Sequence, residues 1–180
     1  PGKPYCWQSP TILSRDAPAV VLLLQWSVAG TAGATARSPY RLVLGASIWL
    51  AYAADRWIEG WRLEPDQIRT QRHYFYQRWR GPLGFCWCAV LGADLTVALA
   101  GLTHREFAGG LILLAPVLVY LLSHQLIHRG HAWRAPKEVC VALLLGGGVA
   151  LFLFTSPAVQ LRPLAGPFVL FCLLCFANCA

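Results

Sequence analysis

The sequence predicts an all-α, polytopic transmembrane helix bundle, and three observations lead to this fold class. Of the 180 residues, 57% are hydrophobic and only 13% are charged, about half the charged fraction of a typical soluble domain. The apolar residues gather in long runs, and about 20 such residues in a helix cross a bilayer. We find no segment with the composition of a separate soluble domain. We therefore expect residues 1–180 to form a single transmembrane domain.

The expected spans are the six longest apolar runs, each bounded by charged residues, proline or glycine. They cover residues 18–34, 40–59, 83–102, 108–128, 138–155 and 163–180. The first follows the charged pair Arg15 and Asp16, and the last is cut off at Ala180. Because the sequence contains no methionine and stops inside an apolar run, we interpret it as a fragment of a longer protein.

Loop charge predicts the orientation of the bundle, since cytoplasmic loops are enriched in Lys and Arg. Eleven of the 15 such residues lie in the N-terminal segment, at the loop after the second span or in the loop after the fourth. The other side holds only Arg37, Arg41, Arg105 and Arg162. This asymmetry predicts a cytoplasmic N-terminus. It also accounts for the net charge of +7 without a nucleic-acid partner, because the cations lie between spans and not on one amphipathic face.

The longest loop, residues 60–82, is rich in both arginine and aromatic residues. A loop of this length in a compact protein is usually functional or disordered, and its aromatic content argues for order. We predict a cytoplasmic cap helix at the membrane surface, with the rings at headgroup depth and the arginines in water. The alternative is an ordinary interfacial helix that only anchors the bundle.

Two carboxylates stand at the entrance of this loop. Asp55 and Glu59 are four residues apart, so a helix places them on one face. A carboxylate at the end of a span must be hydrated, paired or bound to a metal. Two oxygen ligands at this spacing can hold Mg²⁺, with water and substrate phosphates at the remaining positions, and arginines of the loop can contact a diphosphate. Alternatively, Glu59 pairs with Arg62 or Arg56, and Asp55 only ends the helix in water.

A family resemblance bears on these carboxylates. The stretch Asp55-Arg56-Trp57-Ile58-Glu59, followed by Arg69-Thr70 and Arg72-His73, resembles the first signature of the UbiA superfamily of intramembrane prenyltransferases. The stretch from Trp133 to Glu138, which leads into Gly146, Gly147 and Gly148, is similar to the entry of that family's fifth helix. The resemblance extends over nearly all of the chain, although only the Asp55 stretch is specific.

The resemblance implies a bundle of about eight or nine helices, six of them within this sequence, and an enzymatic function. The reaction would be the Mg²⁺-dependent transfer of a prenyl group from a prenyl diphosphate to a lipophilic or aromatic acceptor, in contact with membrane lipid. Asp55 and Glu59 would hold Mg²⁺ and act in catalysis, whereas Arg69, Arg72 and Lys137 would contact the diphosphate.

The sequence departs from the family signature at several positions. Ala51 stands where the family has Asn, Glu59 replaces the last Asp, and His73-Tyr74 replaces an Arg-Pro pair. The second Asp-rich signature, which follows the sixth helix in the family, is not part of this sequence. The chain therefore contains at most half of a site of this type.

Other polar residues within the predicted spans support different functions. His124 and His128 have metal-ligand spacing, but five histidines are fewer than the roughly eight of a membrane di-iron enzyme. Asp94 lies deep in the third span, and an intramembrane carboxylate indicates a functional site by default. It supports an alternative function as a non-catalytic transporter or assembly protein. Asp94 can instead be protonated and hydrogen-bonded to a neighbour such as Gln25, Ser47 or Thr96.

Overall fold

The computed structural model describes residues 16–33, 35–62, 75, 78–126, 145–151, 155, 166, 169–170 and 173. Within residues 59–62 and 120–126 the description covers the backbone alone. The described part of the chain is helical and contains no strand, which confirms the all-α prediction at this level. Its helices are α2 (Asp16–Thr31), α3 (Ser38–Arg62), α5 (Arg80–Gly101) and α6 (His104–Leu126), and residues 145–151 form a further helical segment.

These helices overlap the first four apolar runs, and local sequence explains where two of them meet. The first helix, α2, starts at Asp16, whose charge suits the positive end of the helix dipole. It is followed by Gly33, whose φ of 64° is a left-handed conformation that glycine adopts without strain. Helix α3 then begins at Ser38-Pro39, where proline is tolerated because the first turn needs no backbone donor.

The connection between α5 and α6 consists only of Leu102 and Thr103. Leu102 has an extended backbone, and its N–H donates to Ala98 O at 3.1 Å. A link this short makes two consecutive helices run antiparallel. It therefore places the start of α6 at the end of the bundle where α5 finishes.

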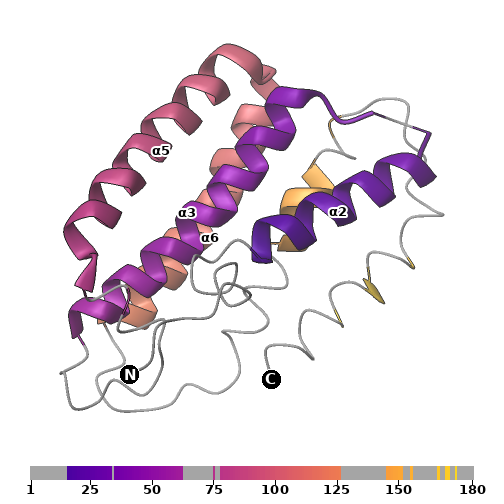
Figure 1. The fold of residues 1–180 in the computed structure, drawn as a ribbon. Coiled ribbons are helices and arrows are strands. Elements are labelled where there is room, and N and C mark those ends of the chain that lie inside the picture. The colour runs from indigo at the N-terminus through magenta and orange to yellow at the C-terminus, as the bar shows by residue number, and fades with distance from the viewer. Residues whose placement is uncertain are drawn as a thin grey trace.

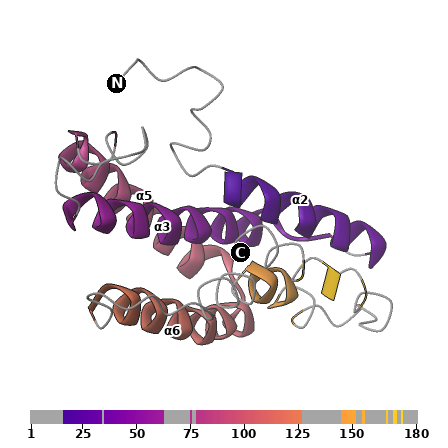
Figure 2. The ribbon, with the colours of Figure 1, turned by 90° about the horizontal axis from the view of Figure 1, so that it is seen from below.

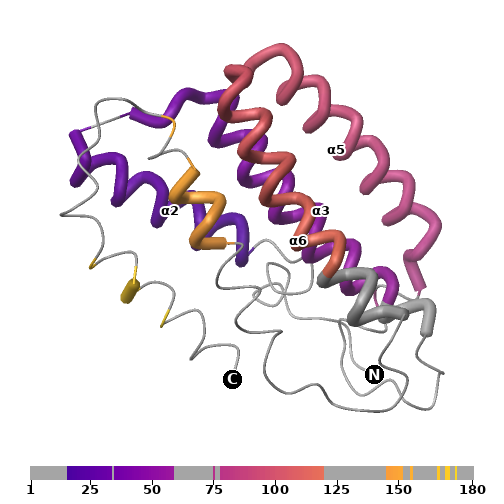
Figure 3. The backbone as a smooth tube through the Cα atoms, turned by 180° about the vertical axis from the view of Figure 1, so that it is seen from behind, coloured from indigo at the N-terminus to yellow at the C-terminus, as the bar shows by residue number. Residues whose placement is uncertain are grey.

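Helix α3 is central to the arrangement (Figure 1). It packs against α5 on one side and α2 on the other, while α6 lies in a second layer behind it (Figure 2). The view from behind shows α6 along α3 and the helical segment 145–151 beside α2 (Figure 3). The end of α3, the start of α5 and the end of α6 thus gather at one end of the bundle.

The core lies between α2, α3 and residues 145–151, and it is built from side chains of all three segments. Its buried members are Val21, Val28, Ala29, Tyr40, Leu44, Ile48, Leu145 and Val149. The Tyr40 hydroxyl donates to Gly148 O at 2.6 Å, so a hydrogen bond also joins α3 to this segment. A side chain at Gly148 would meet Leu44, since its Cβ would lie 2.7 Å from Leu44 Cδ1.

By contrast, the outer faces of α5 and α6 expose large apolar side chains. They are Phe85, Leu91, Leu95 and Leu99 on α5 and Leu111, Ile112, Leu114, Leu118 and Val119 on α6. Each of these side chains is at least 41% exposed. An apolar surface that runs over two helices is unusual for a monomer in water and typical of a surface covered by lipid or protein.

Helix α5 is long and apolar enough to cross a membrane, judged by its length and composition. Among the described residues it is the one helix that meets this criterion. The described part of the chain therefore contains one candidate span. Most of the predicted sixth span and part of the fifth lie outside the described residues.

Candidate functional site

The structure describes one of the predicted magnesium ligands completely. Asp55 lies near the end of α3 with a partly buried side chain. Glu59 lies in the same helix, one turn further along, where the description covers only its backbone. The predicted diphosphate contacts Arg69, Arg72 and Lys137 are outside the described residues, as is most of the predicted cap helix.

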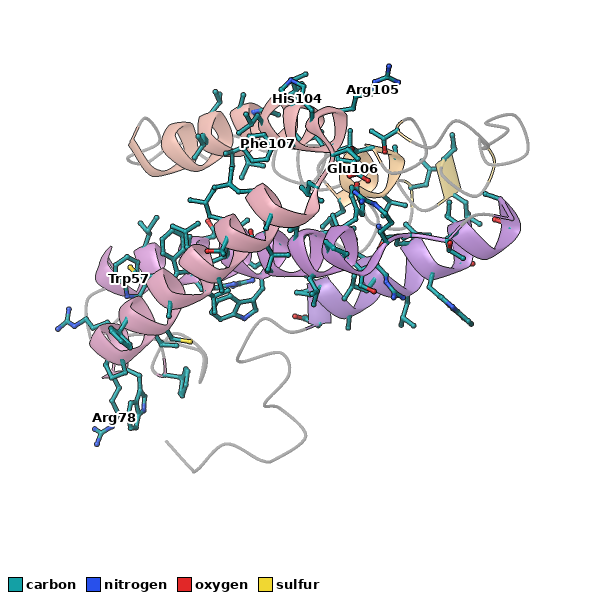
Figure 4. The ribbon with its side chains drawn as sticks, turned by 90° about the horizontal axis from the view of Figure 1, so that it is seen from above. Trp57, Arg78, His104, Arg105, Glu106 and Phe107 are labelled. Carbon is teal, nitrogen blue, oxygen red and sulfur yellow. The ribbon has the colours of Figure 1, made fainter. Side chains whose placement is uncertain are left out.

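The two ends of the arginine-rich loop come together through a tryptophan. Trp57 Nε1 donates to the backbone oxygen of Arg80 at 3.0 Å, which joins the end of α3 to the start of α5. The indole also lies against Gly84, where a Cβ atom would be 3.1 Å from Trp57 Cζ2. Figure 4 shows Trp57 and Arg78 at the same end of the bundle. The loop therefore leaves and re-enters the bundle at one place.

This arrangement gives the shared end of α3 and α5 a mixed charge. Asp55 and Arg56 come from α3, while Arg78 and Arg80 stand exposed before and at the start of α5. The carboxylate of Asp55 and the arginines of the loop are site residues predicted from the sequence. The sequence did not predict that Trp57 joins α3 to α5. Nothing in the sequence distinguishes this indole from the many other aromatic side chains in the region.

The residues at this end fit a magnesium ion in their donor chemistry. Mg²⁺ prefers carboxylate oxygens and commonly takes only one or two from the protein, with water and phosphate completing the shell. Helix α3 continues unbroken through Arg62, so Asp55 and Glu59 occupy one helical face. Within the described part of the chain, no group of three or more His, Cys, Asp or Glu residues has the geometry of a metal site.

A second polar cluster, which was not predicted from the sequence, lies at the opposite end of the bundle. Thr103 Oγ1 accepts from Glu106 N at 3.3 Å, while Glu106 Oε2 accepts from Thr103 N at 2.7 Å and from Thr103 Oγ1 at 2.8 Å. This reciprocal pattern is a capping box, and the Thr-x-x-Glu spacing that announces it is visible in the sequence. Arg37, in the connection before α3, pairs with the same Oε2 at 2.5 Å. Figure 4 labels Glu106 beside its neighbours in the first turn of α6.

The pKa of Glu106 is shifted by opposing effects. Burial raises the pKa of this carboxyl, whereas the hydrogen bonds from Thr103 and the guanidinium of Arg37 lower it, and the net pKa lies below its usual 4.5. Glu106 is only 7% exposed. A buried carboxylate with three donors on one oxygen is well satisfied, so this cluster is a structural junction.

Two further polar side chains, those of Asp94 and Gln25, lie on the helices between the two ends of the bundle. Ser47 Oγ on α3 donates to Asp94 Oδ2 on α5 at 2.9 Å. Of the three partners proposed for Asp94 from the sequence, the described structure shows Ser47, since Thr96 Oγ1 donates to Gly92 O in its own helix. Gln25 is completely buried in α2, and neither of its amide atoms has a hydrogen-bond partner among the described residues.

The last predicted feature is the histidine pair His124 and His128. His124 lies in the last turn of α6, where only the backbone is described, and His128 lies outside the described residues. The imidazoles of both residues are therefore outside what the structure describes.

Comparison with known proteins identifies no relative: no family model, no curated protein and no solved structure matches the chain. The class of protein must therefore be argued from its helices and polar side chains.

Proposed function

We propose that the chain is a multi-pass membrane protein with a cytoplasmic N-terminus that transfers a prenyl group from a prenyl diphosphate to a lipophilic or aromatic acceptor with the help of Mg²⁺. The observation that carries this proposal is the hydrogen bond between Trp57 Nε1 and Arg80 O. It joins the end of α3, which carries Asp55 and Glu59, to the start of α5, which carries Arg80.

The apolar surface supports the membrane location. Exposed side chains such as Phe85, Leu99 and Ile112, which are 79%, 65% and 72% exposed, suit contact with acyl chains. The start of α5 carries Arg78, Trp79 and Arg80, all exposed. Arginine and tryptophan beside an apolar helix suit a cytoplasmic interface, so α5 would run outward from that side.

The chemistry follows from what the residues at this interface can do. In prenyl transfer the bond between the allylic carbon and the diphosphate oxygen breaks, and its electron pair leaves with the diphosphate. A nucleophilic atom of the acceptor then forms the new bond to carbon and releases its proton to water. The chain must therefore stabilise negative charge that develops on the leaving oxygen.

The residues have separate roles in this scheme. Asp55 and Glu59 supply the hard oxygen ligands, and Mg²⁺ bound to them would neutralise charge on the leaving group. Arg69, Arg72 and Lys137 would donate hydrogen bonds to the diphosphate oxygens. Trp57 is a positioning residue, since it joins the helix that carries the carboxylates to the segment after the arginine-rich loop.

The experiment measures pyrophosphate release from farnesyl diphosphate by the full-length protein in lipid nanodiscs, with Mg²⁺ or with EDTA. We expect release only with Mg²⁺, and a loss of about 100-fold in Asp55→Asn, the usual scale for removing one electrostatic contact to the transition state. Asp16→Asn is the matched control, because Asp16 is an exposed carboxylate in the first turn of a different helix, α2. Equal release by Asp55→Asn and the unaltered protein would refute the proposed site.

A further inference from the structure

The carboxyl group of Asp94 occupies an unusual position in the bundle. Asp94 lies in α5, seven residues before its last residue Gly101, which is about 10 Å along the helix axis. Since α5 has 22 residues and a length close to the 30 Å of a hydrocarbon core, this position lies well inside the apolar layer when α5 spans the membrane.

The partners of this carboxyl are few. Oδ2 accepts one hydrogen bond from Ser47 Oγ at 2.9 Å, and Oδ1 is buried without a hydrogen-bond partner in the described part of the chain. Asp94 also has no ion-pair partner among the described residues. One neutral donor does not compensate a full negative charge removed from water.

Among the described residues, the elements around Asp94 bring no cation to its level. Helix α3 is the element packed against α5, and its nearest titratable residues to Ser47 in sequence are Arg41 and Tyr52. Arg41 and Tyr52 lie about 9 and 8 Å from Ser47 along the axis of α3. The charged residues of the first turn of α6 lie beyond the end of α5, where Glu106 is already paired with Arg37.

We infer that Asp94 is a proton-binding site inside the membrane, in which the carboxylic acid form is held between α3 and α5 and Ser47 donates to its carbonyl oxygen. A carboxyl that cannot find a cation becomes neutral by taking up a proton. The acid form also provides an O–H donor within the span. This inference rests on the membrane-spanning orientation of α5 in the proposed function, but it is independent of prenyl transfer.

Two carbodiimides test the inference on the full-length protein in lipid vesicles. A protonated carboxyl transfers its proton to a carbodiimide nitrogen while its oxygen adds to the central carbon, and the adduct rearranges to a stable N-acylurea with no leaving group. Dicyclohexylcarbodiimide enters the membrane, whereas a charged, water-soluble carbodiimide does not. Peptide mass spectrometry locates the label.

We expect the lipophilic reagent to label Asp94 and the water-soluble reagent to leave it unlabelled. Labelling by both reagents would place Asp94 in water and overturn the membrane orientation of α5. Labelling by neither would overturn the proton site while leaving that orientation intact. Asp94→Asn is the isosteric variant that must lose the label, and Glu106→Gln is the control variant that must retain it at Asp94.

The role of Ser47 is tested by the pH dependence of the labelling. In Ser47→Ala, the charged form loses its one described donor, so we expect labelling to persist to a higher pH. Thr96→Val is the matched control, because the Thr96 hydroxyl bonds its own helix at Gly92 O. An identical pH profile in Ser47→Ala and in the unaltered protein would show that Ser47 does not hold this carboxyl.

Discussion

Arg37 and Glu106 are 69 positions apart in sequence, yet the Arg37 guanidinium pairs with Glu106 Oε2 at 2.5 Å. The same oxygen accepts both donors of Thr103, which caps α6. A single carboxylate oxygen therefore joins the connection before α3 to the first turn of α6. This junction holds one end of the bundle, while Trp57 joins α3 to α5 at the other end.

The Glu106 junction predicts a loss of stability in acid. The pKa of Glu106 lies below its usual 4.5 because its hydrogen bonds and Arg37 outweigh the effect of burial. A carboxyl with a lowered pKa contributes stability that is complete above its unfolded pKa and is lost as the pH falls through the folded value. We therefore expect the free energy of unfolding in detergent micelles to decrease below about pH 4.5.

Variants identify the source of this pH dependence. In Glu106→Gln we expect lower stability at pH 7 and a flatter dependence below pH 4.5, because the ion pair is gone at every pH. The half-exposed Arg37 limits the ion pair to about 1 kcal/mol, and the capping box is kept because the amide oxygen of glutamine can still accept from Thr103. Arg105→Gln changes a neighbouring exposed cation and should leave both quantities unchanged. An unaltered acid profile in Glu106→Gln would assign the effect to another carboxyl.

Close packing at the end of α5 predicts that Gly101→Ala lowers the free energy of unfolding, whereas Gly92→Ala does not. A Cβ atom on Gly101 would lie 2.6 Å from Pro39 Cβ, and the rigid proline ring cannot move aside alone. We expect Gly101→Ala to cost about 1 to 3 kcal/mol by forcing α5 away from α3. Gly92→Ala meets no atom within 4 Å and should stabilise the helix by about 0.5 to 1 kcal/mol. Unfolding of both variants in the same detergent provides the comparison, and equal stabilities would contradict the contact.

The hydrogen bond of the Trp87 indole predicts that this side chain stabilises the packing of α5 on α3. Its Nε1 donates to Leu50 O at 2.9 Å, from α5 to the middle of α3. Trp87→Phe keeps an aromatic ring but removes this donor, so we expect a loss of about 1 kcal/mol in the free energy of unfolding. Trp26→Phe, at a side chain that is 72% exposed, should stay within about 0.5 kcal/mol of the unaltered protein. A larger effect at Trp26 than at Trp87 would refute this assignment.

The exposed apolar face of α5 predicts that a charged residue placed there opposes insertion of the helix into a membrane. Leu91 lies near the middle of α5 and is 41% exposed. If α5 spans a membrane, Leu91→Arg opposes insertion by about 2.5 to 3.5 kcal/mol. In a translocon insertion assay we expect a clear fall in the inserted fraction, whereas Arg80→Lys at the helix start should not change it. Unchanged insertion of Leu91→Arg would contradict the transmembrane assignment of α5.

Much of the local structure was predictable because it depends on neighbours in sequence. The apolar runs predicted helices, and α2, α3, α5 and α6 lie on the first four of them. The same run lengths predicted six spans, whereas composition and length identify only α5 as a candidate span among the described residues. The four-residue spacing of Asp55 and Glu59 determines that they share a helical face, because helix periodicity alone decides this.

The tertiary structure alone decided which polar groups meet. The sequence offered Gln25, Ser47 and Thr96 as partners of Asp94, and the packing of α3 on α5 selected Ser47. It also left Gln25 buried among apolar side chains and brought Arg37 to Glu106. Such pairs depend on the rotation and register of two packed helices, which the interlocking of many side chains determines together. No single residue type encodes that alignment, so these contacts emerge only when the helices are assembled.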